Sequence, residues 1–101
     1  MLEIAKEING NSILLILKGR LDTNTAYDLQ KTVSDSIENV NELVINVKDL
    51  EYMSSAGLRL LLIFHKTIDA RGGIFIVKYP NEDIYSILDM TGFTSFLNIE
   101  R

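Results

Sequence analysis

The sequence contains no cysteine and no tryptophan, and it has only one proline and one histidine among 101 residues. The absence of cysteine excludes disulfide bridges, zinc–thiolate sites and thiol nucleophiles. The single histidine, His65, stands apart from any carboxylates at ligand spacing, so we expect no metal site and no cofactor. The only proline is Pro80, and no proline-rich linker divides the chain. We therefore expect a single domain over residues 1–101.

Positive charge is also scarce. Ten lysines and arginines stand against fourteen aspartates and glutamates, which gives a net charge of −4. Binding to nucleic acid needs a basic face, so no direct nucleic-acid partner is expected. The longest apolar run, Leu60 to Phe64, is far too short to cross a bilayer, and no secretory signal is visible. These features predict a cytoplasmic protein that does not insert into a membrane.

The spacing of apolar residues predicts the element order ββαβαβα followed by a tail. Strands are expected at 2–8, 13–17, 43–47 and 74–77, with a last short strand or strand-like tail at 96–99. Helices are expected over 26–40, 58–68 and 84–88. Asn9-Gly10 is typical of a hairpin turn, and the continuous apolar run 13–17 indicates a strand buried on both faces.

The ends of these elements carry recognisable signals. Thr23 or Asn24 can cap the first helix, and residues 49–52 are expected to form a short loop. Gly72 and Gly73 stop the second helix, and Pro80 suits the first turn of the third. Helices between apolar strands imply right-handed crossovers. The sequence thus predicts an α/β domain with helices packed on a mostly parallel sheet of about five strands, including an antiparallel N-terminal edge strand.

Two adjacent serines, Ser54 and Ser55, stand at the start of the most apolar helix. They lack the G-x-S-x-G pattern of a nucleophile elbow. Ser55 and His65 lie ten residues apart in one expected helix, roughly 15 Å at helical rise, so they cannot form a catalytic pair. The sequence accordingly offers no parts for an enzyme.

The serine pair has two interpretations. Serine is a preferred N-cap, because its hydroxyl accepts from N–H groups that have no partner in the first helical turn. The same N–H groups and the positive helix end favour an anion, so a phosphorylated serine would also be stabilised there. Spacing alone leaves both interpretations open.

The whole chain resembles a STAS domain of the bacterial anti-sigma factor antagonist type. The resemblance rests on the hairpin, on Gly19-Arg20-Leu21-Asp22, and on D-L-x-x-M-S-S-A-G-L-R-x-L-L at residues 49–62. It continues through Gly72-Gly73 and a strand to M-T-G-F at residues 90–93. Neither short motif is specific alone, but their order and the elements between them match the family.

The resemblance implies a protein that works by binding. In such pathways the unphosphorylated antagonist binds an anti-sigma factor that is also a serine kinase of the GHKL type. The kinase phosphorylates the antagonist, and a PP2C-type phosphatase reverses the modification. The match places Ser55, and less favourably Ser54, at the phosphorylated position. The residues implied in partner binding are Asp22, Ser54, Ser55, Gly57 and Arg59.

The chain also departs from the family in places. Many antagonists have an aspartate directly before the phosphorylated serine, where this chain has Ser54, and a serine or threonine after it, where this chain has Ala56. Many relatives also carry a further C-terminal helix that the pattern after Ile99 does not show. The alternative function is a STAS scaffold or an ABC-transporter-associated subunit, in which the serines only cap the helix.

Overall fold

The computed structural model describes residues 1–101, and it opens with the predicted antiparallel hairpin. Strands β1 (Leu2–Asn9) and β2 (Ser12–Leu21) are joined by a two-residue turn at Gly10 and Asn11. Gly10 has a φ of 62°, which glycine adopts without steric cost. The turn therefore lies one residue later than Asn9-Gly10, and β1 forms one edge of the sheet.

Three further strands extend the sheet in the order β1-β2-β3-β4-β5. β3 (Glu42–Met53), β4 (Ile74–Lys78) and β5 (Asn98–Glu100) are all parallel to β2. The helices are α1 (Thr23–Ser34), α2 (Ser55–Asp69) and α3 (Glu82–Met90). This arrangement confirms the predicted α/β class, the mostly parallel sheet and the antiparallel edge strand.

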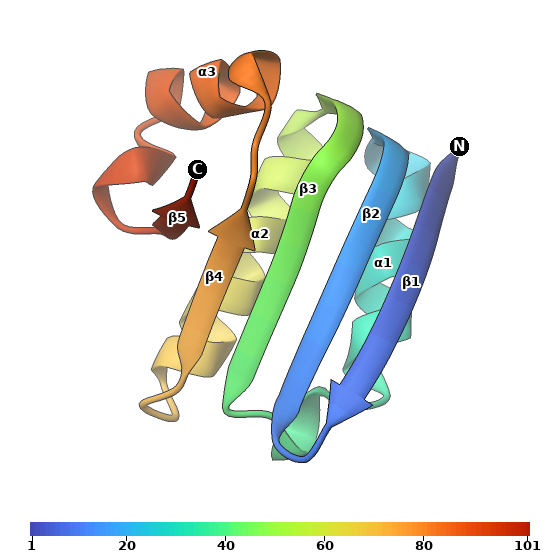
Figure 1. Cartoon of the computed structure of the whole chain (residues 1–101), viewed down its shortest axis with the longest axis vertical. Coiled ribbons are helices and arrows are strands. Elements are labelled where there is room, and N and C mark those ends of the chain that lie inside the picture. The colour runs from blue at the N-terminus through green and yellow to red at the C-terminus, as the bar shows by residue number, and fades with distance from the viewer.

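Helices α1 and α2 cover the same face of the sheet (Figure 1). The parallel strands follow one another in a single direction across the sheet, so successive right-handed crossovers return on the same side. One hydrophobic core of 22 buried residues lies between the helices and the sheet, and it extends to α3 through Ile84 and Leu88. α3 lies beyond the end of β4, where the amide of Asn81 donates to the Leu50 carbonyl at 2.9 Å.

The prediction that β2 is buried on both faces is wrong. Ile13, Leu15 and Leu17 point into the core and are almost completely buried. Leu14 is only half-buried, and Ile16 keeps 36% of its surface exposed, because no helix covers that side of the sheet. The strand is apolar on both faces, but the chain itself covers only one of them.

The first helix ends earlier than predicted. α1 stops at Ser34, and a separate 3₁₀ turn, Ile37–Asn39, follows it. The guanidinium of Arg71 donates to the carbonyls of Ile37 and Val40, which holds this segment outside the helix. Apolar residues at positions 37 and 40 continue the helical spacing but serve the turn that leads into β3.

The segment 49–52 is part of a strand, contrary to the prediction of a loop. β3 continues through it to Met53 by pairing with the end of β2, with Gly19 opposite Leu50 and Leu21 opposite Met53. Shifts in register on either side of Lys18 and Gly19 interrupt the alternation that sequence patterns depend on. The consequence is that β2 and β3 end side by side.

The third helix begins two residues after Pro80. Asn81 is its N-cap and accepts from the Ile84 N–H at 2.9 Å, so Pro80 lies before the first turn and not within it. A second 3₁₀ turn, Phe93–Ser95, connects α3 to β5. The predicted last strand is therefore present as β5.

Candidate functional site

Ser54 lies between the end of β3 and the start of α2. Its backbone N–H donates to the carbonyl of Leu21 at 2.8 Å, which joins the ends of β2 and β3. Its Oγ accepts from the Gly57 N–H at 3.4 Å, so Ser54 is the N-cap of α2. Of the two interpretations of the serine pair, helix capping is therefore confirmed for Ser54.

Ser55 is the first residue of α2 and is exposed to solvent. Its hydroxyl takes part in none of the hydrogen bonds of the structure, in contrast to the capping Oγ of Ser54. The first N–H groups of a helix have no partner one turn back, and the helix end carries partial positive charge. The two neighbouring serines therefore differ, because the Ser54 hydroxyl caps the helix and the Ser55 hydroxyl is exposed and makes no hydrogen bond within the chain.

Gly57 packs against the ends of both strands and is buried. A Cβ at this position would lie 2.9 Å from Cγ of Leu21 and 3.0 Å from Cγ of Met53. Leu21 and Met53 are themselves buried, so neither can move aside freely. Gly57 therefore sets the position of the first turn of α2, and it does not itself reach the surface.

Asp22 caps α1, which corrects the expectation that Thr23 or Asn24 does so. Its Oδ1 accepts from the N–H groups of Thr25 at 3.0 Å and Asn24 at 3.1 Å. The Thr25 hydroxyl in turn accepts from the Asp22 N–H at 2.8 Å, which completes a capping box. The N–H and hydroxyl of Thr25 stabilise the carboxylate and lower the pKa of Asp22 below its ordinary value of 3.8. The other carboxylate oxygen, Oδ2, accepts none of these bonds and remains open to a partner.

A substitution series at Asp22 separates its capping role from its charge. Asp22→Ala removes the cap and should lower the melting temperature at pH 7 by a few degrees, whereas Asp22→Asn keeps an acceptor and should stay near wild type. Because the folded pKa is lowered, the stabilisation is complete above the ordinary value of 3.8 and is lost as pH falls through the folded pKa. The difference between wild type and Asp22→Ala should therefore narrow in acid. Melting curves followed by circular dichroism from neutral to acid pH measure this, and a constant difference would contradict it.

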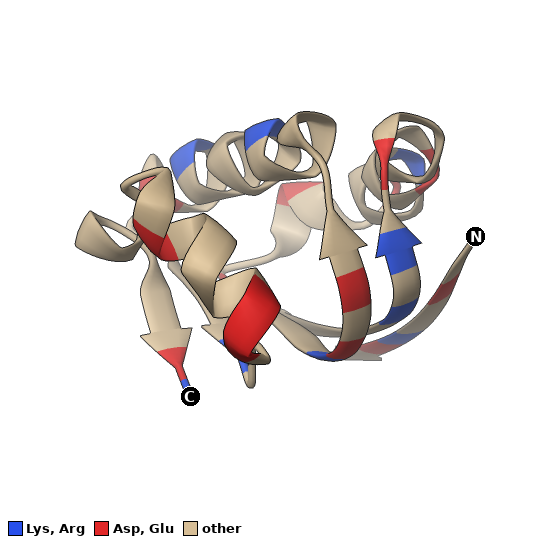
Figure 2. Ribbon diagram, turned by 90° about the horizontal axis from the view of Figure 1, so that it is seen from above, with Lys and Arg blue, Asp and Glu red and all other residues tan.

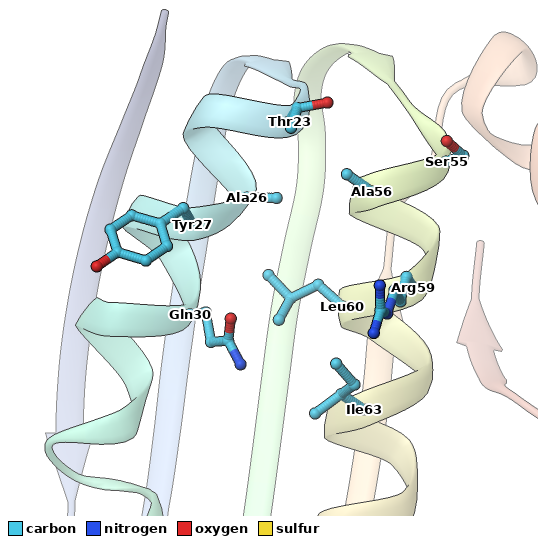
Figure 3. Close-up of a pocket in the computed structure, with 9 residues that line it drawn as sticks. All are labelled: Thr23, Ala26, Tyr27, Gln30, Ser55, Ala56, Arg59, Leu60 and Ile63. Carbon is cyan, nitrogen blue, oxygen red and sulfur yellow. The ribbon is translucent and has the colours of Figure 1, made fainter.

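A groove of about 590 Å³ separates the N-terminal halves of α1 and α2 (Figure 3). Ser55 lies at its upper end and Arg59 one helical turn below. The side chains that line it are Thr23, Ala26, Tyr27, Gln30, Ser55, Ala56, Arg59, Leu60 and Ile63. The structure thus brings Ser55 and Arg59 together on one surface, while Asp22 caps the helix on the opposite side of the groove.

Tyr27 and Gln30 are groove residues that the sequence did not single out. Tyr27 is 67% exposed although it is a large aromatic residue. Thr23, Tyr27 and Gln30 recur at helical spacing on the outer side of α1, next to the buried stripe. The helical spacing of this second stripe can be read from the sequence. Its position next to Ser55 cannot, because that depends on how α1 and α2 pack side by side.

Acidic residues gather at the end of the molecule that carries Ser55. Figure 2, which looks onto this end, shows blue segments at the end of β2, where Lys18 and Arg20 lie. It also shows red segments at the end of β3 and at the start of α3. They are Asp49, Glu51, Glu82 and Asp83, and all four are exposed. No three histidine, aspartate or glutamate side chains come together as metal ligands. None of the helices combines the length and the apolar character needed to cross a membrane.

The fold, the capped serine at the start of α2 and the groove beside it define a class of protein. The family model described as STAS domain matches residues 3–101, and the chain belongs to this family. It is related to anti-sigma factor antagonists. It is 28% identical to the anti-sigma F factor antagonist of Paenibacillus polymyxa, over 97% of this chain and 86% of the relative. It is also 28% identical to the anti-sigma-B factor antagonist of Bacillus subtilis, over 90% of this chain and 84% of the relative.

Solved structures share the fold at lower identity. A crystal structure of an anti-sigma factor antagonist from Mycobacterium paratuberculosis superposes with a TM-score of 0.87 at 19% identity. The match covers 99% of this chain and 86% of that one. The STAS arrangement of sheet and helices is thus common to these proteins.

Proposed function

We propose that this protein is an anti-sigma factor antagonist that binds an anti-sigma factor serine kinase of the GHKL type. Phosphorylation of Ser55 ends the binding, and a PP2C-type phosphatase restores it. The protein acts in the cytoplasm and catalyses no reaction itself. The observation that carries the proposal is the exposed hydroxyl of Ser55, free of internal hydrogen bonds, at the N-terminus of α2 and at the rim of the groove.

The environment of Ser55 is suited to reversible phosphorylation. Ser54 already caps the helix, so modification of Ser55 breaks no hydrogen bond that holds the fold. The positive end of α2 stabilises the added negative charge. The domain should remain folded in both forms while the charge and shape of the groove rim change.

The charge of the surrounding surface supports a basic partner. The exposed acidic residues at the ends of β3 and α3 lie at the same end of the molecule as Ser55 (Figure 2). Opposite charges steer association and fix the orientation of docking. A phosphate adds up to two negative charges and must be desolvated if the partner packs over it. A partner that contacts Ser55 closely would therefore lose affinity when it is phosphorylated.

The test is a phosphorylation and binding assay with the cognate anti-sigma factor kinase. Incubation with ATP should place one phosphate on the chain. Isothermal titration should then show that the phosphorylated form binds the kinase at least tenfold more weakly, a loss of about 1.4 kcal/mol in binding free energy. Ser55→Asp should mimic this loss. Absence of phosphate together with unchanged binding by Ser55→Asp would sink the proposal and favour the scaffold or transporter-subunit alternative.

A further inference from the structure

The face of the sheet opposite α1 and α2 is uncovered and largely apolar. Figure 1 shows strands β2 and β3 with both of these helices behind them, and Figure 2 shows the two helices on one side of the sheet. The apolar side chains on the uncovered face are half-buried or exposed, and they are Leu14, Ile16, Val44, Ile74 and Ile76. Ile74 keeps 49% of its surface exposed, and Ile16 keeps 36%. Parallel sheets are almost always covered on both faces, so this patch calls for an occupant.

Charges border this patch asymmetrically. The register aligns Glu7, Leu14, Val44 and Ile76 in one row across four strands. The next row contains Ala5, Ile16, Asn46 and Lys78, and Glu3 lies one row further along β1. The β1 border of the patch therefore carries carboxylates, and the β4 border carries the ammonium group of Lys78. Lys78 has only Glu100 beside it, at 3.5 Å on an exposed part of the surface.

We infer that a second copy of this chain covers the face, related by a twofold axis that runs parallel to the strands between β2 and β3. This rotation lays β2 of one copy over β3 of the other, and each row of residues then faces the same row of the partner. β1 of one copy then lies over β4 of its partner. Lys78 falls between the levels of Glu3 and Glu7 across the interface, and the apolar residues stack at the centre. A twofold axis perpendicular to the strands would instead set β1 over β1 and bring carboxylates together.

The size of the face fits a weak, reversible dimer. The twofold axis superimposes four strands of each copy, because β5 then lies beyond β1 of the partner. Four strands about 4.8 Å apart and three rows about 7 Å apart cover roughly 19 by 20 Å, or about 800 Å² in total for two copies. This area lies below the standard range for specific interfaces and fits a weak, transient dimer, so dissociation in the high micromolar range is expected. Ser55 and its groove lie on the opposite, helical side of the sheet. Both copies would therefore present their grooves to solvent, and the inference does not depend on phosphorylation.

Charge reversal across the interface tests the axis directly. Sedimentation equilibrium of the full chain from low to high micromolar concentration should show a monomer–dimer equilibrium. Glu7→Lys and Lys78→Glu should each weaken the dimer by about tenfold, because each sets like charges opposite one another. Mixing the two variants should restore most of the association, since positions 7 and 78 again carry opposite charges at both ends of the mixed dimer, and only Glu3 of one copy still faces a carboxylate. Lys66→Glu, an exposed lysine on α2, is the matched control and should associate as wild type.

Three outcomes would overturn the inference. The first is a chain that stays monomeric at all concentrations. The second is a dimer that tolerates both Glu7→Lys and Lys78→Glu, because it then uses another surface. The third is a mixture that does not recover, because the two charges then do not face each other. Both residues lie at the rim of the exposed face, so both variants should fold. Circular dichroism spectra check this.

Discussion

Ser55→Ala should take up no phosphate from the kinase, whereas Ser54→Ala should be phosphorylated like the wild type. Ser55 is exposed and its hydroxyl is unbonded, while Ser54 is half-buried and its Oγ accepts from the Gly57 N–H. A kinase needs a hydroxyl that can enter its active site, and only Ser55 offers one without uncapping the helix. Phosphopeptide mass spectrometry after reaction with ATP measures the site.

In stability, the order of the two variants should be reversed, and Ser54→Ala should be more affected than Ser55→Ala. Ser54→Ala removes the N-cap of α2 and should lower the free energy of unfolding by about 0.5–1 kcal/mol, the lower part of the usual range because the cap hydrogen bond is long. Ser55→Ala removes no hydrogen bond and should be nearly neutral. Urea denaturation measures both values. Phosphate on Ser54, or a larger loss of stability in Ser55→Ala than in Ser54→Ala, would contradict the assignment of Ser54 as the cap and Ser55 as the phosphorylated residue.

Ser54→Asp adds a control for kinase recognition. Aspartate is as good an N-cap as serine, and its charge suits the positive end of the helix, so stability should be kept. The substitution also introduces the aspartate that many antagonists carry before the phosphorylated serine. A faster phosphorylation of Ser55 in this variant would mean that the kinase reads the preceding carboxylate, and an unchanged rate would mean that it does not.

Periodic burial explains which parts of the fold could be predicted. The stripe of Ala26, Leu29 and Val33 lies in the core as the helical spacing predicts, and the run from Leu43 to Val47 forms the central part of a strand. Glycines at positive φ, Gly72 and Gly92, end their helices as expected. These features depend on neighbours along the chain, which a sequence displays directly.

Features that depend on neighbours in space were missed. β3 continues through 49–52 only because the end of β2 lies beside it, and an irregular register hides the alternation of side chains. Leu14 and Ile16 look like core residues because apolar character does not reveal whether a helix covers them. At the site, the motif pointed to Ser54 and Ser55, but it could not show which hydroxyl is bonded or that Tyr27 lines the same groove.

Gly57→Ala should destabilise the domain although alanine is the better helix former. The added Cβ would approach Cγ of Leu21 to 2.9 Å and Cγ of Met53 to 3.0 Å, in a region where both neighbours are buried. Overpacking of this kind costs about 1–3 kcal/mol, and the gain in helix propensity offsets about 1 kcal/mol or less. Urea denaturation should show a net loss of stability, and a stabilised variant would contradict the packing described for this turn.

The effect of Gly57→Ala on function should follow from displacement of the first turn of α2, which carries Ser55. We expect weaker kinase binding and slower phosphorylation even in the folded fraction. Leu21→Ala by itself should cost about 2–5 kcal/mol, since Leu21 is fully buried. In the double variant the Cβ at position 57 would occupy part of the space that Leu21 leaves. The double variant should therefore lose less free energy of unfolding than the sum of the two single variants. Simple additivity would mean that Gly57 and Leu21 do not press on one another, and the close packing of α2 onto the strand ends would then not be what positions Ser55.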